Sequence, residues 1–596
     1  MKELSQVKRL FDVSQFQRDR YNRPVAFGHR VNGPWKTISS QEWLDGVNTV
    51  ARALVGYGIK KGDRIGLISG NRIEWTLLDH AILKAGAITV PVYPTISIDD
   101  YKYMFNHSGL RLCFTSDKSL YNKILKVKED TPALEGIYTF DKGESLPYWE
   151  EFVKKYDDAS LQSKLEEVAA SVDEDDVATL IYTSGTTGTP KGVQLTHRNI
   201  LTNAIVALPL VKEVEEKVAL SFLPLCHIFQ RTVDVAYQLL GCSIYYAKST
   251  ETIATDAQAV HPVVMMVVPR VIERVYAKVI AKGEALKGIK KAIFFWAVGV
   301  GRRYKPYSKN IFYNAQLWVA RKLVFNKWRE ALGGNLNLII SGSSALDPRL
   351  SRLFCATGMM LNEGYGLTES SPIISTNIYN NRGLRIGSIG RPLPCNDVKI
   401  AEDGEILVKG PCVMKGYYKD PERTAEAIDE DGYLHTGDVG YLKDGFLYIT
   451  DRKKEMFKTS GGKYITPQPM ETRLGRSKFI EQAMVIGDGR QHPGVIIEPD
   501  MVELKAWCEK EGIDTSDLKA MVTHQKVQKL YRSEINEVNK TLSGWEKMKR
   551  FHVVTDVWTV ENKLITPTLK LKRKNLMELY AKEIAEMYKD EEKTNL

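Results

Sequence analysis

The chain has 596 residues, several times the usual length of one folding unit, which predicts a protein of more than one part with ample core. Its 43% hydrophobic and 26% charged residues exclude an intrinsically disordered chain. The formal charge of +10 suits an anionic substrate, an anionic membrane surface or nucleic acid about equally well. Charge alone therefore selects no function.

The cysteines and the apolar segments indicate where the protein works. The seven cysteines form no CxxC pair, and their odd number argues against a disulfide framework or a zinc knuckle, so we expect a reducing, cytosolic setting. The charged N-terminus lacks the apolar stretch of a secretory signal. The longest apolar runs, 263–268 and 293–300, fall short of the ~20 residues that span a bilayer. Any membrane contact is expected to be peripheral.

The first third of the chain predicts an α/β core. Short β-rich runs alternate with a helical stretch over 63–95, which is typical of strand-helix-strand units and of a partly parallel sheet. The polar, acidic segment 151–176 leads into the apolar run 177–183. We interpret that run as a buried strand that delivers a loop.

The loop Tyr182 to Gly192 is the strongest chemical signal, because it packs three glycines and five Ser/Thr hydroxyls into eleven positions. Glycines let backbone N–H groups approach an anion, hydroxyls add donors, and Lys191 supplies positive charge, so the loop predicts a phosphate site. A flexible surface turn is the plain alternative. A P-loop would continue into a helix, whereas the alternating V-Q-L here predicts a second strand, with helical spacing resuming after Thr196.

The second half of the chain changes character twice. Between 276 and 329, aromatic and basic residues at loosely helical spacing predict helices. After Lys399 come short strands separated by Gly-rich turns. The charged run DRKKEMFK then marks a boundary, which gives an N-terminal domain over 1–451 and a small C-terminal domain over 452–596.

Further motifs follow the phosphate loop in order: Leu223-Pro-Leu-Cys-His227, Asn362-Glu-Gly-Tyr-Gly-Leu-Thr-Glu369, Tyr433-Leu-His-Thr-Gly-Asp438 and Asp451-Arg-Lys-Lys-Glu-Met456. Each of these motifs, taken alone, also has a purely structural interpretation. A lone histidine after an apolar run is as often a core or capping residue as a functional one. Asp438 after a glycine is typical of a turn, and the segment 362–369 could be a turn with a solvated glutamate.

Together, the loop and these four motifs resemble the acyl-adenylate-forming superfamily of acyl-CoA synthetases, luciferases and peptide-synthetase adenylation domains. The resemblance covers nearly the whole chain. It implies an α/β fold, with a large N-terminal domain of mixed sheets flanked by helices and a small mobile C-terminal α+β domain. It also implies ATP, Mg²⁺ and coenzyme A as cofactors or co-substrates.

The resemblance implies a role for individual residues in binding the nucleotide. Tyr365 would stack on adenine, Asp438 would hold the ribose hydroxyls, and Arg452 would contact ribose or phosphate. Glu369, with Thr183, would hold the magnesium ion. The full set of implied nucleotide-binding residues is Thr183, Ser184, Gly185, Thr186, Thr187, Gly188, Thr189, Lys191, Gly342, Ser343, Glu363, Gly364, Tyr365, Gly366, Asp438 and Arg452.

The implied catalytic residues are His227, Thr368, Glu369 and Lys570. Thr368 would contact the α-phosphate, and His227 would border the carboxylate and the thiol. Lys570 matches the catalytic lysine, although Leu569 stands where relatives usually have glycine, and Lys572 and Arg573 are nearby alternatives. Relatives also usually carry glutamate at the position of Gln230, which leaves any charge-dependent role there open.

A hinge is also implied, because two different reactions must occur at one site. Lys454 occupies the hinge position, and the loop 461–465 matches the one that turns inward for thioester formation. The 451–471 and 566–573 segments look most like those of long-chain fatty acyl-CoA synthetases.

The predicted function is activation of a long-chain fatty acid by ATP through an acyl adenylate, then transfer to coenzyme A with release of AMP and pyrophosphate. The alternatives are a ligase that loads a carrier protein and an inactive lipid-binding relative. Nucleic acid is not expected as a partner. The predicted location is cytoplasmic, with peripheral membrane contact left open.

Overall fold

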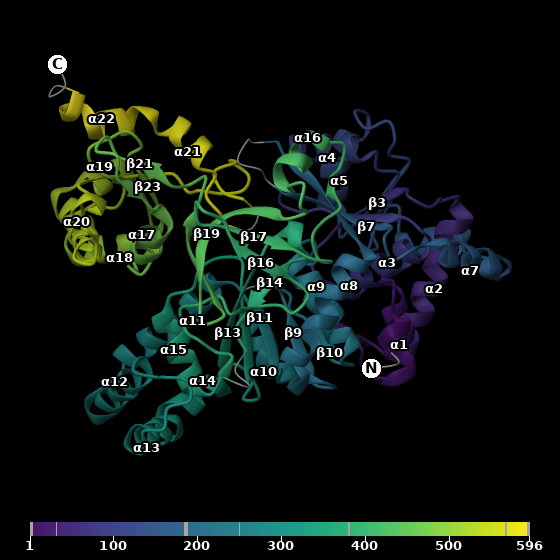
Figure 1. Ribbon diagram of the computed structural model, residues 1–596, viewed down its shortest axis with the longest axis horizontal. Coiled ribbons are helices and arrows are strands. Elements are labelled where there is room, and N and C mark those ends of the chain that lie inside the picture. Colours follow the sequence, from purple (N-terminus) through teal and green to yellow (C-terminus); the bar gives the residue numbers. More distant parts are fainter. Residues whose placement is uncertain are drawn as a thin grey trace. The chain divides into compact units, whose positions relative to one another are not determined.

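The computed structural model describes residues 4–30, 33–183, 189–249, 251–378, 382–566 and 569–592 (Figure 1). The chain divides into two compact units. The first unit comprises Met1–Lys399, Leu407–Thr436 and Leu442–Tyr448. The second comprises Ile400–Ile406, Gly437–Tyr441 and Ile449–Leu596. The functional boundary predicted at 451/452 remains a prediction.

A nine-stranded sheet forms one part of the first unit. Its strands, in spatial order, are β15 Arg391–Pro392, β14 Ile373–Thr376, β13 Met360–Gly366, β12 Leu338–Ser341, β11 Val264–Val267, β9 Val218–Ser221, β10 Ser243–Tyr246, β1 Phe27–His29 and β2 Lys36–Ile38. The strands from β13 to β1 are parallel, and the outer pairs are antiparallel. The central strands are almost wholly buried, as expected of a parallel sheet covered on both faces.

A seven-stranded sheet forms another part of the same unit. In order, its strands are β18 Gly416–Tyr417, β8 Lys191–Thr196, β7 Val177–Thr183, β4 Ile88–Pro91, β3 Arg64–Ile68, β5 Leu112–Thr115 and β6 Gly136–Thr139. The β3 and β4 strands are parallel and are separated in the chain by the helix Ile73–Lys84, so the strand-helix-strand prediction for 63–95 is confirmed. The β7 and β8 strands pair antiparallel, which confirms that the phosphate loop joins two strands.

The helices of the first unit include the predicted ones. They are α1 Asp12–Arg20, α2 Ser40–Tyr57, α3 Ile73–Lys84, α4 Ile98–Ser108, α5 Lys118–Lys128, α6 Trp149–Tyr156, α7 Gln162–Ser171, α8 His197–Ala207, α9 Ile228–Leu239, α10 Ile253–Val260, α11 Pro269–Glu284, α12 Gly288–Arg302, α13 Ile311–Ala320, α14 Asn326–Glu330, α15 Pro348–Thr357 and α16 Pro421–Ala427. The α8 helix begins after Thr196, whose side chain accepts from the Asn199 N–H as an N-cap. The helices expected between 276 and 329 are present.

Residues 397–452 form the expected short strands, arranged as a sheet in the order β16 Asp397–Ile400, β17 Glu405–Lys409, β19 Leu434–Lys443 and β20 Phe446–Arg452. Glycines at turns between them, such as Gly404 and Gly445, adopt positive φ values of 85° and 75°. Side chains with a Cβ disfavour that backbone region, so glycine suits these turns.

The second unit is a small α+β body. Its strands are β21 Phe457–Lys458 and β22 Tyr464–Ile465, which form a hairpin, and β23 Ile480–Ile486, β24 Gly494–Pro499 and β25 Arg550–Val553, which form a sheet. Its helices are α17 Pro467–Leu474, α18 Met501–Lys510, α19 Leu518–Thr523, α20 Gln525–Asn539, α21 Arg573–Leu579 and α22 Ala581–Glu592. Along β23, Val485 joins one hydrophobic cluster while Met484 and Ile486 join another. Both faces of this sheet are therefore buried.

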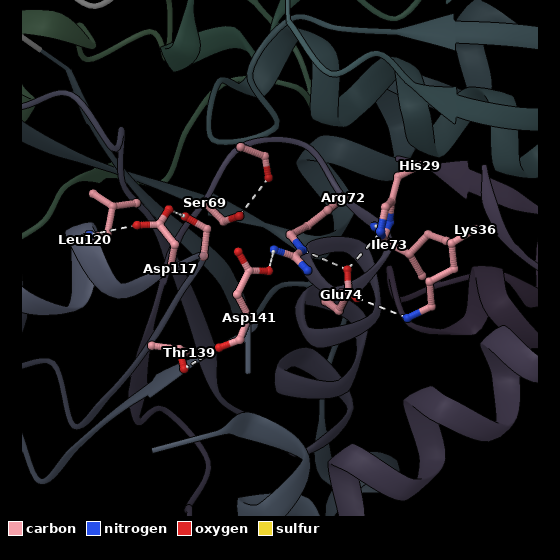
Figure 2. Close-up of polar contacts among 12 residues, drawn as sticks. His29, Lys36, Ser69, Arg72, Ile73, Glu74, Asp117, Leu120, Thr139 and Asp141 are labelled. Carbon is pink, nitrogen blue, oxygen red and sulfur yellow. Dashed lines mark hydrogen bonds and ion pairs between the residues drawn. The ribbon is translucent and has the colours of Figure 1, made fainter. Parts of the chain in front are cut away.

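A buried ion network fixes the loop between β3 and α3 in the first unit (Figure 2). Arg72 donates to Glu74 over 2.8 Å and to Asp141 over 2.9 Å, and Lys36 donates to Glu74 over 3.3 Å. Burial opposes ionisation of Glu74, but the Arg72 hydrogen bond and charge lower the pKa of its carboxyl to about 2. His29 accepts the Ile73 N–H over 2.9 Å. The loop that contains Asn71 is thereby held in place.

Within the described residues, no helix combines the length and apolar character needed to cross a bilayer.

Candidate active site

The phosphate-loop hairpin places its two ends side by side. Thr183, the last residue of β7, pairs directly with Lys191, the first of β8. Thr189 is exposed. Ser184, Gly185, Thr186, Thr187 and Gly188 lie outside the described residues, so their predicted phosphate contacts stay predictions.

Tyr417 connects this hairpin to Glu369. Its strand, β18, pairs with β8, which places the Tyr417 ring centroid 4.6 Å from the Lys191 ammonium nitrogen. The Tyr417 hydroxyl donates to the Glu369 carboxylate over 2.9 Å. Burial and the nearby Glu369 charge both raise the pKa of Tyr417, so it stays a neutral donor. Two predicted residues that are far apart in the chain are thus linked by a third that the sequence analysis missed.

The signal that would have found Tyr417 is weak. The segment Gly416-Tyr417-Tyr418 has no motif-like spacing from the phosphate loop, and only the pairing of β18 with β8 brings it there. The residues just before this segment also hold the Glu369 main chain, because the Met414 N–H donates to the Glu369 carbonyl over 2.8 Å. Glu369 is therefore positioned through both its side chain and its backbone.

The β13 strand carries the predicted adenine-binding residues. Tyr365 is half-buried and packs against the edge of the main hydrophobic core. A Cβ on Gly366 would lie 1.7 Å from the Pro372 carbonyl oxygen, so only glycine permits this approach of two backbone segments. A Cβ on Gly364 would meet no atom closer than 3.4 Å. Close backbone packing therefore explains why residue 366 is a glycine, but it does not explain the glycine at 364.

Glu363 points into the protein. Its carboxyl accepts the Ser351 hydroxyl over 2.8 Å, and Ser351 lies on α15. Burial raises the pKa of Glu363 to about 7. The described contacts of this side chain are internal, so a nucleotide contact by Glu363 stays a prediction.

The loop after β12 approaches the start of α9. A Cβ on Gly342 would lie 2.7 Å from the Phe229 ring, so glycine is required for the contact. Ser343 has a φ of +72°, a strained value for a residue with a side chain. Phe229 in turn donates its N–H to the His227 Nδ1 atom over 3.2 Å. Phe229, which the sequence analysis did not single out, thus joins the two predicted segments.

His227 is the N-cap of α9 and is half-buried. The capping role that the sequence left open is therefore present, and a positioning role stays compatible with it. The segment before it is braced from the other sheet, because Asn71 donates to the Leu223 carbonyl over 2.7 Å and accepts from the Leu225 N–H over 3.0 Å.

Gln230 faces the interior of α9. It donates to Asp234 over 2.7 Å, and both side chains are buried. Burial raises the pKa of Asp234 to about 7, while hydrogen bonds from Gln230, Tyr246 and Ser221 lower it. Thr368, the other predicted catalytic residue of this unit, lies half-buried in the short 3-10 turn Thr368–Ser370 beside Glu369.

In the second unit, the two predicted ribose-binding residues are in contact. The Arg452 Nε atom donates to the Asp438 carboxylate over 3.0 Å, joining the end of β20 to β19. Asp438 is buried, whereas Arg452 is half-buried. Arg452 thus orients the carboxylate that we predicted to accept the ribose hydroxyls. Lys454, at the predicted hinge, is exposed.

Lys570 lies in a tight turn with an exposed side chain. The Thr566 N–H donates to the Lys570 carbonyl over 2.8 Å, and the Lys570 N–H donates to the Thr566 hydroxyl over 3.0 Å. Leu569 has a φ of +60°, a backbone region that favours glycine over residues with a side chain. Pro567 and Thr568 lie outside the described residues.

The neighbouring bases differ from Lys570 in their surroundings. The Arg573 guanidinium lies 2.6 Å from the Glu471 carboxylate and 3.5 Å from that of Glu455, so it is a structural cation. Lys572 is half-buried, and its N–H donates to the Leu564 carbonyl over 2.9 Å. Exposure therefore favours Lys570 as the functional lysine.

The predicted thioester loop is the turn of the β21–β22 hairpin. Gly462 has a φ of +73°, whereas Gly461 has no such requirement. A Cβ on Gly461 would meet only the Thr459 hydroxyl at 3.8 Å. The loop thus tolerates a side chain at Gly461, which makes that position suitable for a functional test.

Comparison with protein families gives two matches. A family described as AMP-binding enzyme matches residues 14–418, and one described as AMP-binding enzyme C-terminal domain matches residues 455–592. Together they cover nearly all of both units.

Curated relatives match over most of their length. The chain is 34% identical to long chain acyl-CoA synthetase 6, peroxisomal, of Arabidopsis thaliana, covering 94% of this chain and 83% of the relative. It is 32% identical to the long-chain-fatty-acid–CoA ligase FadD15 of Mycobacterium bovis, covering 95% of each. Among solved structures, the adenylation domain of a carboxylate reductase from Mycobacterium chelonae superimposes with a TM-score of 0.75 at 22% identity, covering 99% of this chain and 93% of that one. That likeness concerns the fold alone.

Proposed function

Because the chain belongs to the AMP-binding enzyme family, we propose that it activates a long-chain fatty acid with ATP and transfers the acyl group to coenzyme A. The observation that carries the first step is the connection from Lys191 through Tyr417 to Glu369. A cation and a carboxylate thus lie on either side of a single tyrosine, and we propose that the cation binds phosphate and the carboxylate a metal ion.

In the first half-reaction, the fatty acid carboxylate attacks the α-phosphorus of ATP and pyrophosphate leaves. Lys191 and the phosphate loop would hold the phosphates, Thr368 would contact the α-phosphate, and Tyr365 would pack on adenine. Catalysis here rests on positioned charge rather than on covalent chemistry by the protein.

The donor set fits a magnesium ion. Mg²⁺ is usually held by one or two carboxylates together with substrate phosphates, rather than by an all-protein cage. In the described part of the chain, no cluster of three or more His, Cys, Asp or Glu side chains suited to a metal occurs. Glu369 would supply the carboxylate and Thr183 a hydroxyl. When bound, the ion would neutralise charge on the phosphate oxygens.

In the second half-reaction, the coenzyme A thiol attacks the acyl carbonyl and AMP leaves. We propose that a C-terminal domain over 452–596 changes position between the steps, with Lys454 at the hinge. Lys570 would serve the first step and the loop around Gly461 the second. Asp438 would hold the ribose, oriented by Arg452.

The test is an exchange assay on the full chain. ATP–pyrophosphate exchange is measured with fatty acids of rising chain length, and coenzyme A is then added. Exchange that depends on a long-chain acid, followed by acyl-CoA and AMP, supports the proposal. An acyl adenylate that reacts only with a carrier protein would favour the carrier-loading alternative, and ligand binding without exchange would favour an inactive lipid-binding protein.

We also propose peripheral contact with an anionic membrane surface, with the enzyme on the cytoplasmic side. Residues 285–329 contain eleven Lys and Arg side chains and no Asp or Glu. Helices α12 and α13 from this segment extend together at one end of the first unit (Figure 1). An excess of bases beside apolar groups is what an anionic lipid surface attracts.

The apolar groups of this segment are exposed. Phe312 is 84% exposed, Ile311 80% and Trp318 58%, and Lys322 lies 4.3 Å above the Trp318 ring. Phe295, Trp296 and Trp318, the aromatic residues that could instead have belonged to the core, are among the exposed large hydrophobic residues, whereas Phe325 and Trp328 are buried. An exposed patch of this kind is typical of an interaction site.

Vesicle flotation tests this contact. The triple change Ile311→Ser, Phe312→Ser and Trp318→Ser should abolish most binding to vesicles that contain anionic lipid, and salt should weaken binding by the unmodified protein. Val502→Ser, at a residue that is 79% exposed on the second unit, is the matched control. Equal binding by the triple variant and the control would refute the contact.

A further inference from the structure

Two cysteines of the first unit are in direct contact. The sulfur atoms of Cys395 and Cys412 lie 3.7 Å apart. Cys395, in the turn after β15, is half-exposed, whereas Cys412, in the loop after β17, is buried. Among the described residues, this is the only pair of thiols in hydrogen-bond contact. The two sulfur atoms are close enough that a small movement would let them form a disulfide bond.

The two thiols differ in reactivity. The hydrogen bond from Cys412 lowers the pKa of the Cys395 thiol, although partial burial opposes this effect. The same contact, together with burial, raises the pKa of Cys412. Burial raises the pKa of other cysteines, such as Cys113 and Cys226. The thiolate is the form that oxidants attack, so the accessible Cys395 is the preferred site of oxidation.

The loop that contains Cys412 is tied to the proposed metal site. The Asn199 side chain donates to the carbonyls of Pro411 and Val413, over 2.7 and 3.0 Å. One residue further on, the Met414 N–H donates to the Glu369 carbonyl over 2.8 Å. A displacement of Cys412 is therefore transmitted to Glu369 through a short stretch of backbone.

The segment that contains Cys395 is tied to the neighbouring strand. The Asn396 side chain donates to the carbonyls of Ile373 and Ile374, each over 3.2 Å. These residues belong to β14, which pairs with β13 and thus with the strand of Tyr365. The two cysteines consequently lie on segments that hold two different parts of the proposed nucleotide site.

We propose that Cys395 and Cys412 are a redox modification site, at which a peroxide closes a reversible disulfide that slows adenylation. The regulatory part rests on the proposed function. Formation of the disulfide does not, because it depends only on the two thiols and their separation.

The chemistry balances with hydrogen peroxide as the oxidant. The Cys395 thiolate attacks one peroxide oxygen, the O–O bond breaks, and one water and a sulfenic acid result after proton transfer. The Cys412 sulfur then attacks the Cys395 sulfur, the S–O bond breaks, and a second water leaves as the S–S bond forms. Two thiols are oxidised and one peroxide is reduced. A dithiol reductant reverses the step by thiol–disulfide exchange.

The disulfide shortens the separation of the sulfurs from 3.7 Å to about 2 Å, so at least one of the two segments must move. A shift of about 1 Å in a positioned group can lower a rate about a hundredfold. We therefore expect oxidation to reduce ATP–pyrophosphate exchange by at least about tenfold.

The experiment treats the full chain with increasing hydrogen peroxide and then with dithiothreitol. Peptide mass mapping should find Cys395 and Cys412 joined, and exchange activity should fall and then recover on reduction. Cys395→Ser should keep the activity of the reduced enzyme and resist the peroxide. Cys508→Ser, which removes a buried cysteine of the second unit, should behave as the unmodified protein.

Three results would overturn the proposal. One is oxidation of Cys395 to a sulfinic acid with no linked peptide. Another is a linked peptide with unchanged exchange activity, and a third is an equal loss of activity in Cys395→Ser. If the reduced protein shows no exchange at all, the proposed function fails, and peptide mapping still decides whether the disulfide forms. Because Cys395 is half-exposed, its serine variant provides the decisive comparison even if a change at buried Cys412 prevents folding.

Discussion

Tyr417 and Glu369 are 48 positions apart in the chain, yet the phenolic hydroxyl of the tyrosine donates to the glutamate carboxylate over 2.9 Å. The ring that carries this hydroxyl also lies against the Lys191 ammonium group. Tyr417 thus orients the proposed magnesium ligand relative to the phosphate loop.

Tyr417→Phe should lower ATP–pyrophosphate exchange by about ten- to a hundredfold, because a hydrogen bond to a charged group contributes roughly 1.5 to 3 kcal/mol. The loss should be largest at low magnesium, since Glu369 would be less well oriented. Tyr418→Phe is the matched control, because the Tyr418 ring packs on His107 rather than on Glu369. Equal loss in both variants at every magnesium concentration would show that Tyr417 is not a positioning residue.

Asn71→Ala should slow both half-reactions without unfolding the protein. The change removes the hydrogen bonds to Leu223 and Leu225 that brace the segment before His227, so we expect about a tenfold loss in each step, since small displacements of positioned groups are costly. Asn106→Ala is the control, because the Asn106 side chain also makes two hydrogen bonds to the main chain, donating to the carbonyls of Lys102 and Asp130. Single-turnover measurements of each step, with circular dichroism for folding, check this. A loss of the same size in the Asn106 variant would mean that a general structural effect is responsible.

Lys570→Ala should reduce acyl-adenylate formation by on the order of a hundred- to a thousandfold, the usual effect of removing one preorganised charge donor. Supplied acyl adenylate should still react with coenzyme A at the normal rate. Lys572→Ala is the comparison, and it should leave both steps nearly unchanged because that side chain is half-buried at the start of α21. If Lys570→Ala slowed both steps equally in a folded protein, either the hinge or the choice of lysine would be wrong.

Gly461→Val should have the opposite selectivity, slowing thioester formation while sparing ATP–pyrophosphate exchange. The hairpin accommodates a side chain there, since the nearest atom to a Cβ is the Thr459 hydroxyl at 3.8 Å. The added bulk should therefore act when the loop meets coenzyme A, not on folding. Gly544→Val, with no atom within 4 Å of its Cβ position, serves as the control in the same unit. A loss of exchange in Gly461→Val would contradict the assignment of this loop to the second step.

In the unmodified protein, the free energy of unfolding should fall as the pH rises from mildly acidic to neutral. Asp234→Asn should make this fall smaller. Burial raises the pKa of Asp234 in the folded protein to about 7, against the ordinary value of 3.8. The fold therefore favours the protonated form, so this contribution is complete below pH 3.8 and is lost as the pH rises to about 7. Urea unfolding at pH values across this window checks the difference. Parallel stability curves for the variant and the unmodified protein would show that Asp234 does not titrate there.

Local sequence determined much of the hairpin and its surroundings. The apolar run 177–183, the Gly-rich loop and the alternating residues after Lys191 predicted two strands joined by a loop, and β7 and β8 are those strands. The helix after Thr196 also follows from local chemistry, because an N-cap acts on the N–H group three residues later. These elements can be predicted from the sequence because the interactions that form them join residues only a few positions apart.

Tertiary structure alone decided how distant segments meet. Asn71 braces Leu223 across 152 positions, Tyr417 reaches Glu369, and Cys395 touches Cys412, and none of these pairs has a spacing that predicts contact. The order of strands in the two large sheets decides these contacts, because it determines which loops become neighbours. Tertiary structure also decided the surroundings of individual charged side chains. Arg573 and Lys570 look alike in sequence, but Arg573 pairs with the Glu471 carboxylate, because the start of α21 lies against α17, whereas the Lys570 side chain is exposed. A sequence motif identifies side chains that are chemically suited to bind or react. The surroundings that determine their protonation state and position form only when distant segments pack together.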